Sequence, residues 1–387
     1  MSEFVPGNRI ELLRAGTEYF PALEAACDGA QHEIYLETYI FEDDATGQRI
    51  GAALARAAGR GVTVYVMIDA FGSKDLGEDF LIALRRAGVR VLKYRPQISP
   101  WTLRRERLRR LHRKIAVIDA RLAFVGGINI IDDMHTPRQV PPRFDYAVRV
   151  EGPLLEPIHA AVVNLWTLVM WTQFRRRGPL NAITVQAAPC GTRRGAFVVR
   201  DNLRHRNDIE SAYLEAIGKA TKDVLIANAY FFPGKSFRRA LAEAKARGVR
   251  VVLLLQGRVE YVLLHYASRA LYRFFLDAGI EIYEYHRSFL HAKVAVVDGR
   301  WSTVGSSNID PMSLLLAREA NVLIDDADFA RELKSSLDEA MALGAVRVDS
   351  VAWQHQSLPA RAMTWICYEL VRFLTGWSSY GRAREFS

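Results

Sequence analysis

The same short pattern occurs twice in this chain of 387 residues, and it limits the folds that are open to the sequence. The first copy, H-x-K-x4-D-x6-G-G-x-N, begins at His112, and the second, H-x-K-x4-D-x6-G-S-x-N, begins at His291. The identical spacing indicates an internal duplication that gives two similar halves. The ionisable positions of the two copies are the catalytic candidates: His112, Lys114, Asp119, His291, Lys293 and Asp298.

The repeat extends beyond this pattern. Gly61 and Gly248 each begin a β-branched run after a helix rich in Ala and Arg, and Gly88 and Gly279 do so again. Short apolar runs that alternate with helices of about 10–15 residues are typical of α/β domains. The sequence therefore predicts an α/β fold built from two homologous halves. Pro, Gly and Arg accumulate where the halves join, and the predicted units are a first lobe, a second lobe and an amphipathic tail: residues 1–178, 179–345 and 346–387.

Each motif is predicted to lie on two strands joined by a tight turn. The strand pairs are residues 115–118 with 122–125 and 294–297 with 301–304. Because alternate residues of a strand share a face, the His and Lys of each copy point to the same side. The turns contain Asp119 and Asp298, and Asp-Gly is a strong hairpin signal. We expect these aspartates to brace the turn or pair with a neighbouring cation rather than act as bases.

Two imidazoles and two ammonium groups in one site suit the cleavage of a phosphodiester without a metal or a cofactor. A neutral imidazole can attack phosphorus, and an imidazolium can protonate the departing oxygen. The lysines neutralise the phosphoryl oxygens. The two histidines need opposite protonation states, so we expect their surroundings to push their pKa values apart. Small and amide side chains of the motifs are the candidates for binding phosphate: Gly127, Asn129, Ser306 and Asn308.

A carboxylate begins a strand after each motif. Asp145 and Glu319 occupy matching positions in the two halves. A carboxylate there can hold one nitrogen of an imidazole and thereby fix its tautomer. Both residues are therefore candidates for orienting a histidine.

The charge and the cysteines restrict the partners and the compartment. The net charge of +9 and the isoelectric point near 9.5 favour anionic partners, either nucleic acid or an acidic membrane surface. Three widely spaced cysteines do not make a disulfide framework and suit a reducing cytoplasm. We find no signal peptide, and no run reaches the ~18–20 apolar residues of a spanning helix.

Four segments bear on the choice between lipid and nucleic acid. Residues 101–113 combine a tryptophan with six arginines, which fits an anionic membrane surface or a solvated face beside a phosphate site. Residues 154–171 and 261–275 are apolar enough to be core helices or to face lipid in part. Residues 360–377 either lie in the membrane interface or pack onto the lobes. Together these segments favour phospholipid, and no nucleic acid is expected.

The paired motif resembles that of the phospholipase D superfamily over most of the chain. The resemblance implies two α/β/α lobes packed pseudo-symmetrically around one active site, and a phosphohistidine mechanism. It implies His112 as the nucleophile and His291 as the general acid. It further implies that Asp145 orients His112 and that Glu319 orients His291.

Within the superfamily the chain is most similar to the short bacterial cardiolipin synthases that lack N-terminal transmembrane helices. The phrases that carry this similarity begin at Glu37, Phe124, Phe144 and Asn228. The implied reaction is phosphatidyl transfer between two phosphatidylglycerol molecules, giving cardiolipin and glycerol, with phosphatidylethanolamine as a possible alternative donor. A peripheral place on the cytoplasmic side of the inner membrane follows. The alternatives are a hydrolytic phospholipase D and a phosphodiesterase or nuclease of the same superfamily.

Overall fold

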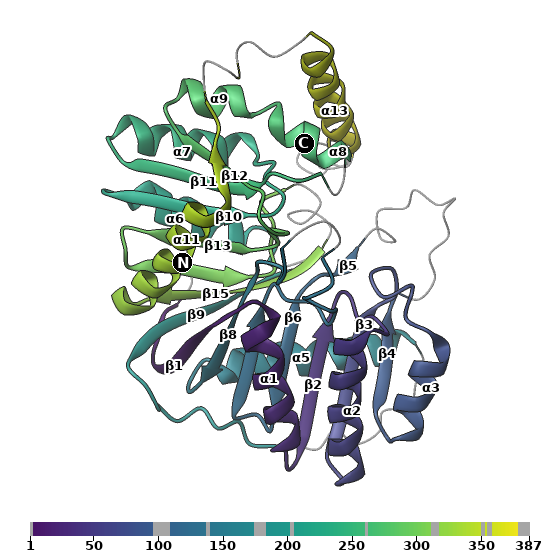
Figure 1. Cartoon of the computed structure of the whole chain (residues 1–387). Helices are drawn as coiled ribbons and strands as arrows, with labels where there is room; N and C mark the ends of the chain where they lie inside the picture. Colours follow the sequence, from purple (N-terminus) through teal and green to yellow (C-terminus); the bar gives the residue numbers. More distant parts are fainter. Residues whose placement is uncertain are drawn as a thin grey trace, which may run out of the picture.

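A computed structural model describes the chain over these residues: 3–95, 109–136, 140–173, 183–201, 205–259, 262–310, 317–349, 353 and 358–377. In this part of the chain the strands form one long sheet, and helices pack on both of its faces (Figure 1). The predicted α/β fold is confirmed.

The first half supplies one side of the sheet. Its strands are β1 (Val5–Arg14), β2 (Glu33–Thr38), β3 (Thr63–Asp69), β4 (Arg90–Tyr94), β6 (Lys114–Ile118), β7 (Leu122–Gly126) and β8 (Tyr146–Glu151). Its helices are α1 (Ala15–Asp28), α2 (Ala45–Gly59), α3 (Glu78–Arg86) and α5 (Leu155–Thr172). From the middle of the sheet outward the order is β1-β8-β7-β6-β2-β3-β4, and β2, β3 and β4 are parallel.

The second half repeats this plan on the other side. Its strands are β9 (Arg193–Arg200), β10 (Asp223–Asn228), β11 (Arg250–Gln256), β12 (Glu281–Tyr285), β13 (Lys293–Val297), β14 (Trp301–Gly305), β15 (Ala317–Asp325) and β16 (Ala345–Arg347). Its helices are α6 (Asp208–Lys219), α7 (Lys235–Ala246), α8 (Val262–Arg269), α9 (Tyr272–Asp277), α11 (Ala327–Gly344) and α13 (Leu358–Trp377). The outward order is β9-β15-β14-β13-β10-β11-β12-β16, which matches the first half strand for strand as far as β12.

Strand β2 is buried on both faces. Every residue of β2 is buried, including two glutamates. This is the pattern expected of a strand that helices cover from both sides. Each buried carboxylate has a partner, because an unpaired charge is costly in the interior. Glu33 lies 2.7 Å from Nε2 of His159 on α5, and both carboxylate oxygens of Glu37 accept from Arg113.

Two strands that the sequence analysis did not predict join the halves. β1 and β9 each precede the first helix of their half, and they pair antiparallel with each other through Val5 with Gly195 and Asn8 with Arg193. β1 also pairs with β8, and β9 pairs with β15, so the sheet is continuous. One hydrophobic core extends across the junction, from Val162 of α5 to Leu333 of α11.

The four motif strands form as predicted, each one residue longer than expected at one end. β6 pairs with β7 and β13 pairs with β14, both antiparallel. The turns between them place Asp119 and Asp298 at positive φ, 51° and 52°. Gly299, at φ 61°, completes the second turn, as the Asp-Gly signal predicted.

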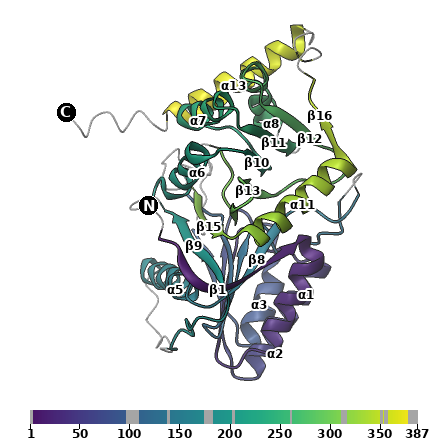
Figure 2. The same ribbon diagram turned by 90° about the vertical axis from the view of Figure 1, so that its left-hand side faces the viewer.

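The apolar segments divide between core and surface. α5 buries one face in the core and leaves Leu168 and Trp171 exposed. α13 packs on α8 through the buried Cys367 and Val371, at the outer surface of the second half (Figure 2). α13 also carries exposed apolar side chains: Met363, Trp365, Ile366, Leu370 and Phe373. Most of the basic segment 101–113 lies outside the described residues.

No helix within the described ranges combines the length and the apolar character needed to cross a membrane. The predicted bounds of the two lobes and of the tail stay predictions.

Candidate functional site

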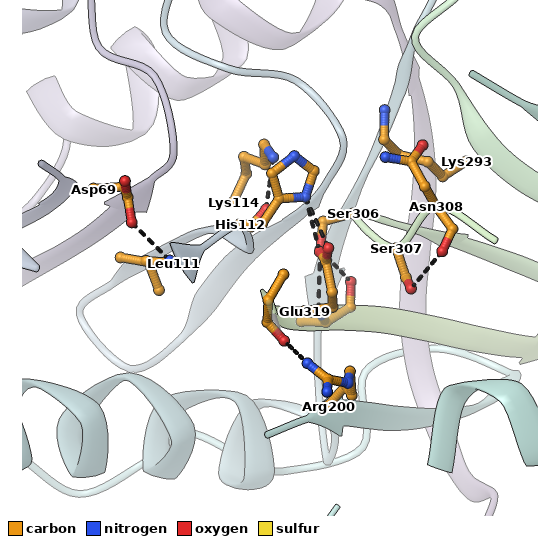
Figure 3. A network of polar contacts seen from close by, with 12 residues as sticks. Asp69, Leu111, His112, Lys114, Arg200, Lys293, Ser306, Ser307, Asn308 and Glu319 are labelled. Atoms are coloured by element: carbon orange, nitrogen blue, oxygen red, sulfur yellow. Dashed lines mark hydrogen bonds and ion pairs between the residues drawn. The ribbon is translucent and has the colours of Figure 1, made fainter. Parts of the chain in front are cut away.

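The two motif histidines lie where the halves meet, and each is attached to the opposite half. The N–H of His112 donates to the carbonyl of Arg318 at 3.0 Å, just after β5 (Arg110–Leu111) pairs in parallel with the start of β15. The N–H of His291 donates to the carbonyl of Phe144 at 2.8 Å. This reciprocal pairing brings the two motifs into one site, part of which is drawn in Figure 3.

The carboxylates that orient the histidines also come from the opposite half. Nδ1 of His112 lies 2.9 Å and 3.1 Å from the two carboxylate oxygens of Glu319, and Nδ1 of His291 lies 2.6 Å from Oδ2 of Asp145. The pairing implied by the resemblance, within each half, is therefore wrong. The reason is the strand pairing: each carboxylate directly follows the residue whose carbonyl holds the other half's histidine.

The lysines share the site with both histidines. Nζ of Lys114 donates to the carbonyl of His112 at 2.6 Å, and Nζ of Lys293 donates to the carbonyl of His291. Both ammonium groups are buried, and burial lowers the pKa of Lys114 to about 7. An anionic ligand would restore its charge, because an opposite charge nearby favours the charged form.

Burial lowers the pKa of both histidines, but to different extents. The pKa of His112 is lowered by burial, and the charge of Glu319 opposes this shift. The pKa of His291 lies well below its usual value, through burial and then the charges of Lys293 and Lys114. Burial also raises the pKa of Asp145 to about 7. Burial therefore favours the uncharged form of His112, of His291 and of Asp145.

The two motifs differ at one signature position, and this difference changes the contacts of the two carboxyl groups. A Cβ atom on Gly127 would lie 2.4 Å from a carboxylate oxygen of Asp145, so only glycine fits there. In the second half Ser306 fits, and its hydroxyl donates to Glu319 at 2.5 Å (Figure 3). Gly127 thus makes room for the Asp145 carboxylate, whereas Glu319 gains a hydroxyl donor. The part of Gly127 and Ser306 in binding phosphate stays a prediction.

The asparagines lie three residues beyond the ends of β7 and β14. Oδ1 of Asn129 accepts the N–H of Ile40 at 3.2 Å, which ties the first motif to the end of β2. Asn308 lies beside Lys293 in Figure 3, and its Oδ1 is buried without a hydrogen-bond partner among the described residues. Their part in binding phosphate stays a prediction.

Asp119 and Asp298 lie at the far ends of their motif strands and contact backbone. The carboxylate of Asp119 accepts the N–H groups of residues 31, 32 and 33 at 2.8–3.0 Å. Asp298 accepts those of residues 221, 222 and 223 at 2.8–3.1 Å. These contacts fit the expectation that the aspartates brace the turns, and they leave no described contact with either histidine.

Two further residues of the site were not predicted. The ring centroids of Tyr39 and His112 lie 4.9 Å apart. Nζ of Lys114 lies 5.4 Å from the ring centroid of Tyr39. Arg200 lies beneath Glu319, donates to the carbonyl of Ala317 and is buried (Figure 3). Tyr39 follows the first strand run of the repeat, which is a usable signal, whereas nothing in the sequence distinguishes Arg200 from other arginines.

Comparisons with known proteins agree with this geometry. Residues 23–138 and 213–341 match a family model described as cardiolipin synthase, PLD-like domain. The chain is 41% identical to cardiolipin synthase B of Escherichia coli K12 over 343 residues, which is 89% of this chain and 83% of that protein. The protein of the same name from Salmonella typhi matches at the same identity and coverage. Among solved structures, phosphatidylserine synthase of Haemophilus influenzae superposes with a TM-score of 0.74 at 14% identity, covering 96% of this chain and 95% of that one; this shows the fold alone.

The two turn aspartates provide a test of their role. Asp119 is 3% exposed and accepts from three N–H groups, of which that of Glu33 is buried, so Asp119→Ala should lower the free energy of unfolding by about 3 kcal/mol. Asp298→Ala is the matched control, and its more exposed turn should lose about 1 kcal/mol. Urea unfolding measures both. A stable Asp119→Ala protein that has lost turnover would instead assign this aspartate to the chemistry.

Proposed function

Because the chain belongs to the family of cardiolipin synthases with phospholipase D-like domains, we propose that it transfers a phosphatidyl group between two phosphatidylglycerol molecules. The products are cardiolipin and glycerol. The family and the kind of enzyme are those that the paired motif predicted. The observation that carries the proposal is the reciprocal arrangement of the site, in which two histidines each bind a buried carboxylate of the opposite half.

In the first step Nε2 of His112 attacks the phosphorus of one phosphatidylglycerol. Nδ1–H of His112 donates to Glu319, which leaves Nε2 as the free nucleophile. The bond from phosphorus to the glycerol oxygen breaks. Nε2–H of His291 protonates that oxygen, while the proton held by Asp145 moves to Nδ1 of His291. Glycerol leaves, and the phosphatidyl group stays on His112.

The second step reverses these movements with a new alcohol. The head-group hydroxyl of a second phosphatidylglycerol gives its proton to Nε2 of His291, and Nδ1 returns its proton to Asp145. The oxygen attacks phosphorus, the phosphorus–nitrogen bond breaks and His112 is restored. Lys114 and Lys293 offset the charge on the phosphoryl oxygens in both steps. One phosphodiester replaces another, so no nucleotide is consumed.

We place the enzyme peripherally on the cytoplasmic side of the inner membrane. The exposed apolar face of α13 supports this placement, because exposed aromatic and aliphatic side chains on one helix face are typical of helices that lie in the membrane interface. The net charge of +9 adds attraction to anionic lipid.

Turnover of phosphatidylglycerol vesicles tests the function. Purified protein should form cardiolipin and free glycerol in equal amounts, as measured by mass spectrometry. His112→Ala and His291→Ala should each lower the rate at least about 100-fold, because each removes a group that moves a proton or forms the covalent bond. Phosphatidic acid without cardiolipin would make the protein a hydrolase.

The pH profile tests the roles of the two carboxylates. The rate should fall above about pH 7, as the Asp145–His291 pair loses its proton, and fall on the acid side as His112 gains one. Asp145→Asn should move the alkaline limb to lower pH, because the remaining His291 has a strongly lowered pKa. Glu319→Gln should move the acid limb to lower pH, because Glu319 raises the pKa of His112. If Asp145→Asn instead moved the acid limb and Glu319→Gln the alkaline limb, His291 would be the nucleophile and His112 the general acid.

Membrane binding tests the assignment of α13. Trp365 and Phe373 are each 64% exposed, and Trp365→Ser with Phe373→Ser should weaken sedimentation with phosphatidylglycerol vesicles at least tenfold, since each large side chain contributes about 2 kcal/mol when buried. Trp171→Ser on α5, 68% exposed in the other half, is the matched control and should bind normally. Weakened binding of the control alone would place the membrane at α5.

A further inference from the structure

A small polar cavity lies in the second half beside the strand that carries His291. It is lined by the ends of β10 and β11 and by α8, and its volume is about 20 Å³, which is room for one hydroxyl group or one water. Ala229, one of its lining residues, donates its N–H to the carbonyl of Ala292, the neighbour of His291, at 3.0 Å. This contact places the cavity next to the segment that carries His291.

A buried hydrogen-bond donor lines this cavity. Gln256 is 6% exposed, and its Nε2 has no hydrogen-bond partner among the described residues. Its Oε1 accepts the N–H of Arg258 at 3.4 Å, which fixes the orientation of the amide. A buried donor without an acceptor costs about 1–3 kcal/mol. The cavity supplies the space for an acceptor atom.

The equivalent side chain in the first half has its hydrogen bonds satisfied by backbone. Strand register places Gln256 opposite Tyr285 and Asp69 opposite Tyr94, so the two residues correspond. The carboxylate of Asp69 accepts three backbone N–H groups, from Phe71, Gly72 and Leu111, at 2.8–3.1 Å. The first half thus satisfies its side chain internally, and the second half presents a donor to an open space.

The other polar residues that line the cavity favour binding of an uncharged group. Burial lowers the pKa of His265 to about 4, so this ring is uncharged at neutral pH. Arg258 donates from Nε to the carbonyl of His286, and Ser268 supplies a hydroxyl to the lining. A cation would face a guanidinium and an amide donor here, whereas a hydroxyl oxygen would find donors at the right place.

We propose that this cavity binds one hydroxyl group of the glycerol head group, and that Gln256 determines specificity for it. The inference rests on the proposed function. The leaving glycerol and the attacking head group both use the proton of His291, so both lie on this side of phosphorus. The leaving glycerol and the attacking head group each carry a secondary hydroxyl on the carbon next to the reacting one. A cavity of this size can bind that hydroxyl in either step.

Two diols that differ only in the position of one hydroxyl test the proposal. With short-chain phosphatidylglycerol as donor, transfer to 1,2-propanediol and to 1,3-propanediol is compared by mass spectrometry of the phosphatidyl products. The wild-type enzyme should prefer 1,2-propanediol about tenfold, because only this diol has a hydroxyl next to the reacting carbon and one satisfied buried donor is equivalent to about 5–30-fold. Equal transfer to the two diols would overturn the proposal without any variant.

Variants then assign the preference to one side chain. Gln256→Met and Gln256→Glu keep the volume but remove the donor, and both should reduce the preference to about onefold. Gln186→Met changes an exposed glutamine and should keep the wild-type preference. A preference that survives both Gln256 changes would exclude this residue as its source. Formation of phosphatidic acid with no transfer to either diol would overturn the proposed function, and this inference with it.

Discussion

The site depends on two buried hydrogen bonds between a carboxyl group and an imidazole that cross between the halves. Glu319 holds His112 and Asp145 holds His291, and in each case the backbone of the preceding residue fixes the same histidine. A carboxylate and an imidazole buried among two lysines are costly in isolation and acceptable only when their partners are in place. The histidine of each half is therefore held and oriented only when the other half is in place. The continuous sheet and the shared core are what keep the partners in register.

Burial shifts the pKa values of the groups that the proposed chemistry uses. Desolvation disfavours charge on His112, His291 and Lys114 alike. An arriving phosphodiester reverses this, because its negative charge favours protonated forms nearby. The site thus becomes most cationic when the substrate anion is present. The difference between Gly127 and Ser306 gives the two carboxyl groups different hydrogen-bond partners.

Much of this arrangement was predictable from the repeat. The motif hairpins, the single α/β fold and the bracing role of Asp119 follow from spacing, alternation and turn chemistry. β1 was missed because Pro6, Gly7 and Asn8 interrupt its apolar pattern, and β9 because arginines open it. The exchange of carboxylates was missed for a different reason. Asp145 and Glu319 are equivalent by sequence, and only the pairing of strands across the junction decides which histidine each one meets.

The shared sheet also determines how a lipid enters. β1 pairs with β8 and β9 at the junction, and the same hydrophobic core extends to helices of both halves. Separating the halves would break this ladder and expose the core, so the enzyme does not open and close as two jaws around its substrate. In the proposed function, movement is then left to the lipid: its head group would leave the bilayer surface and enter a preassembled site, while its acyl chains would stay in the membrane. Turnover would then respond to how readily the bilayer releases a head group, and hence to lipid packing and curvature.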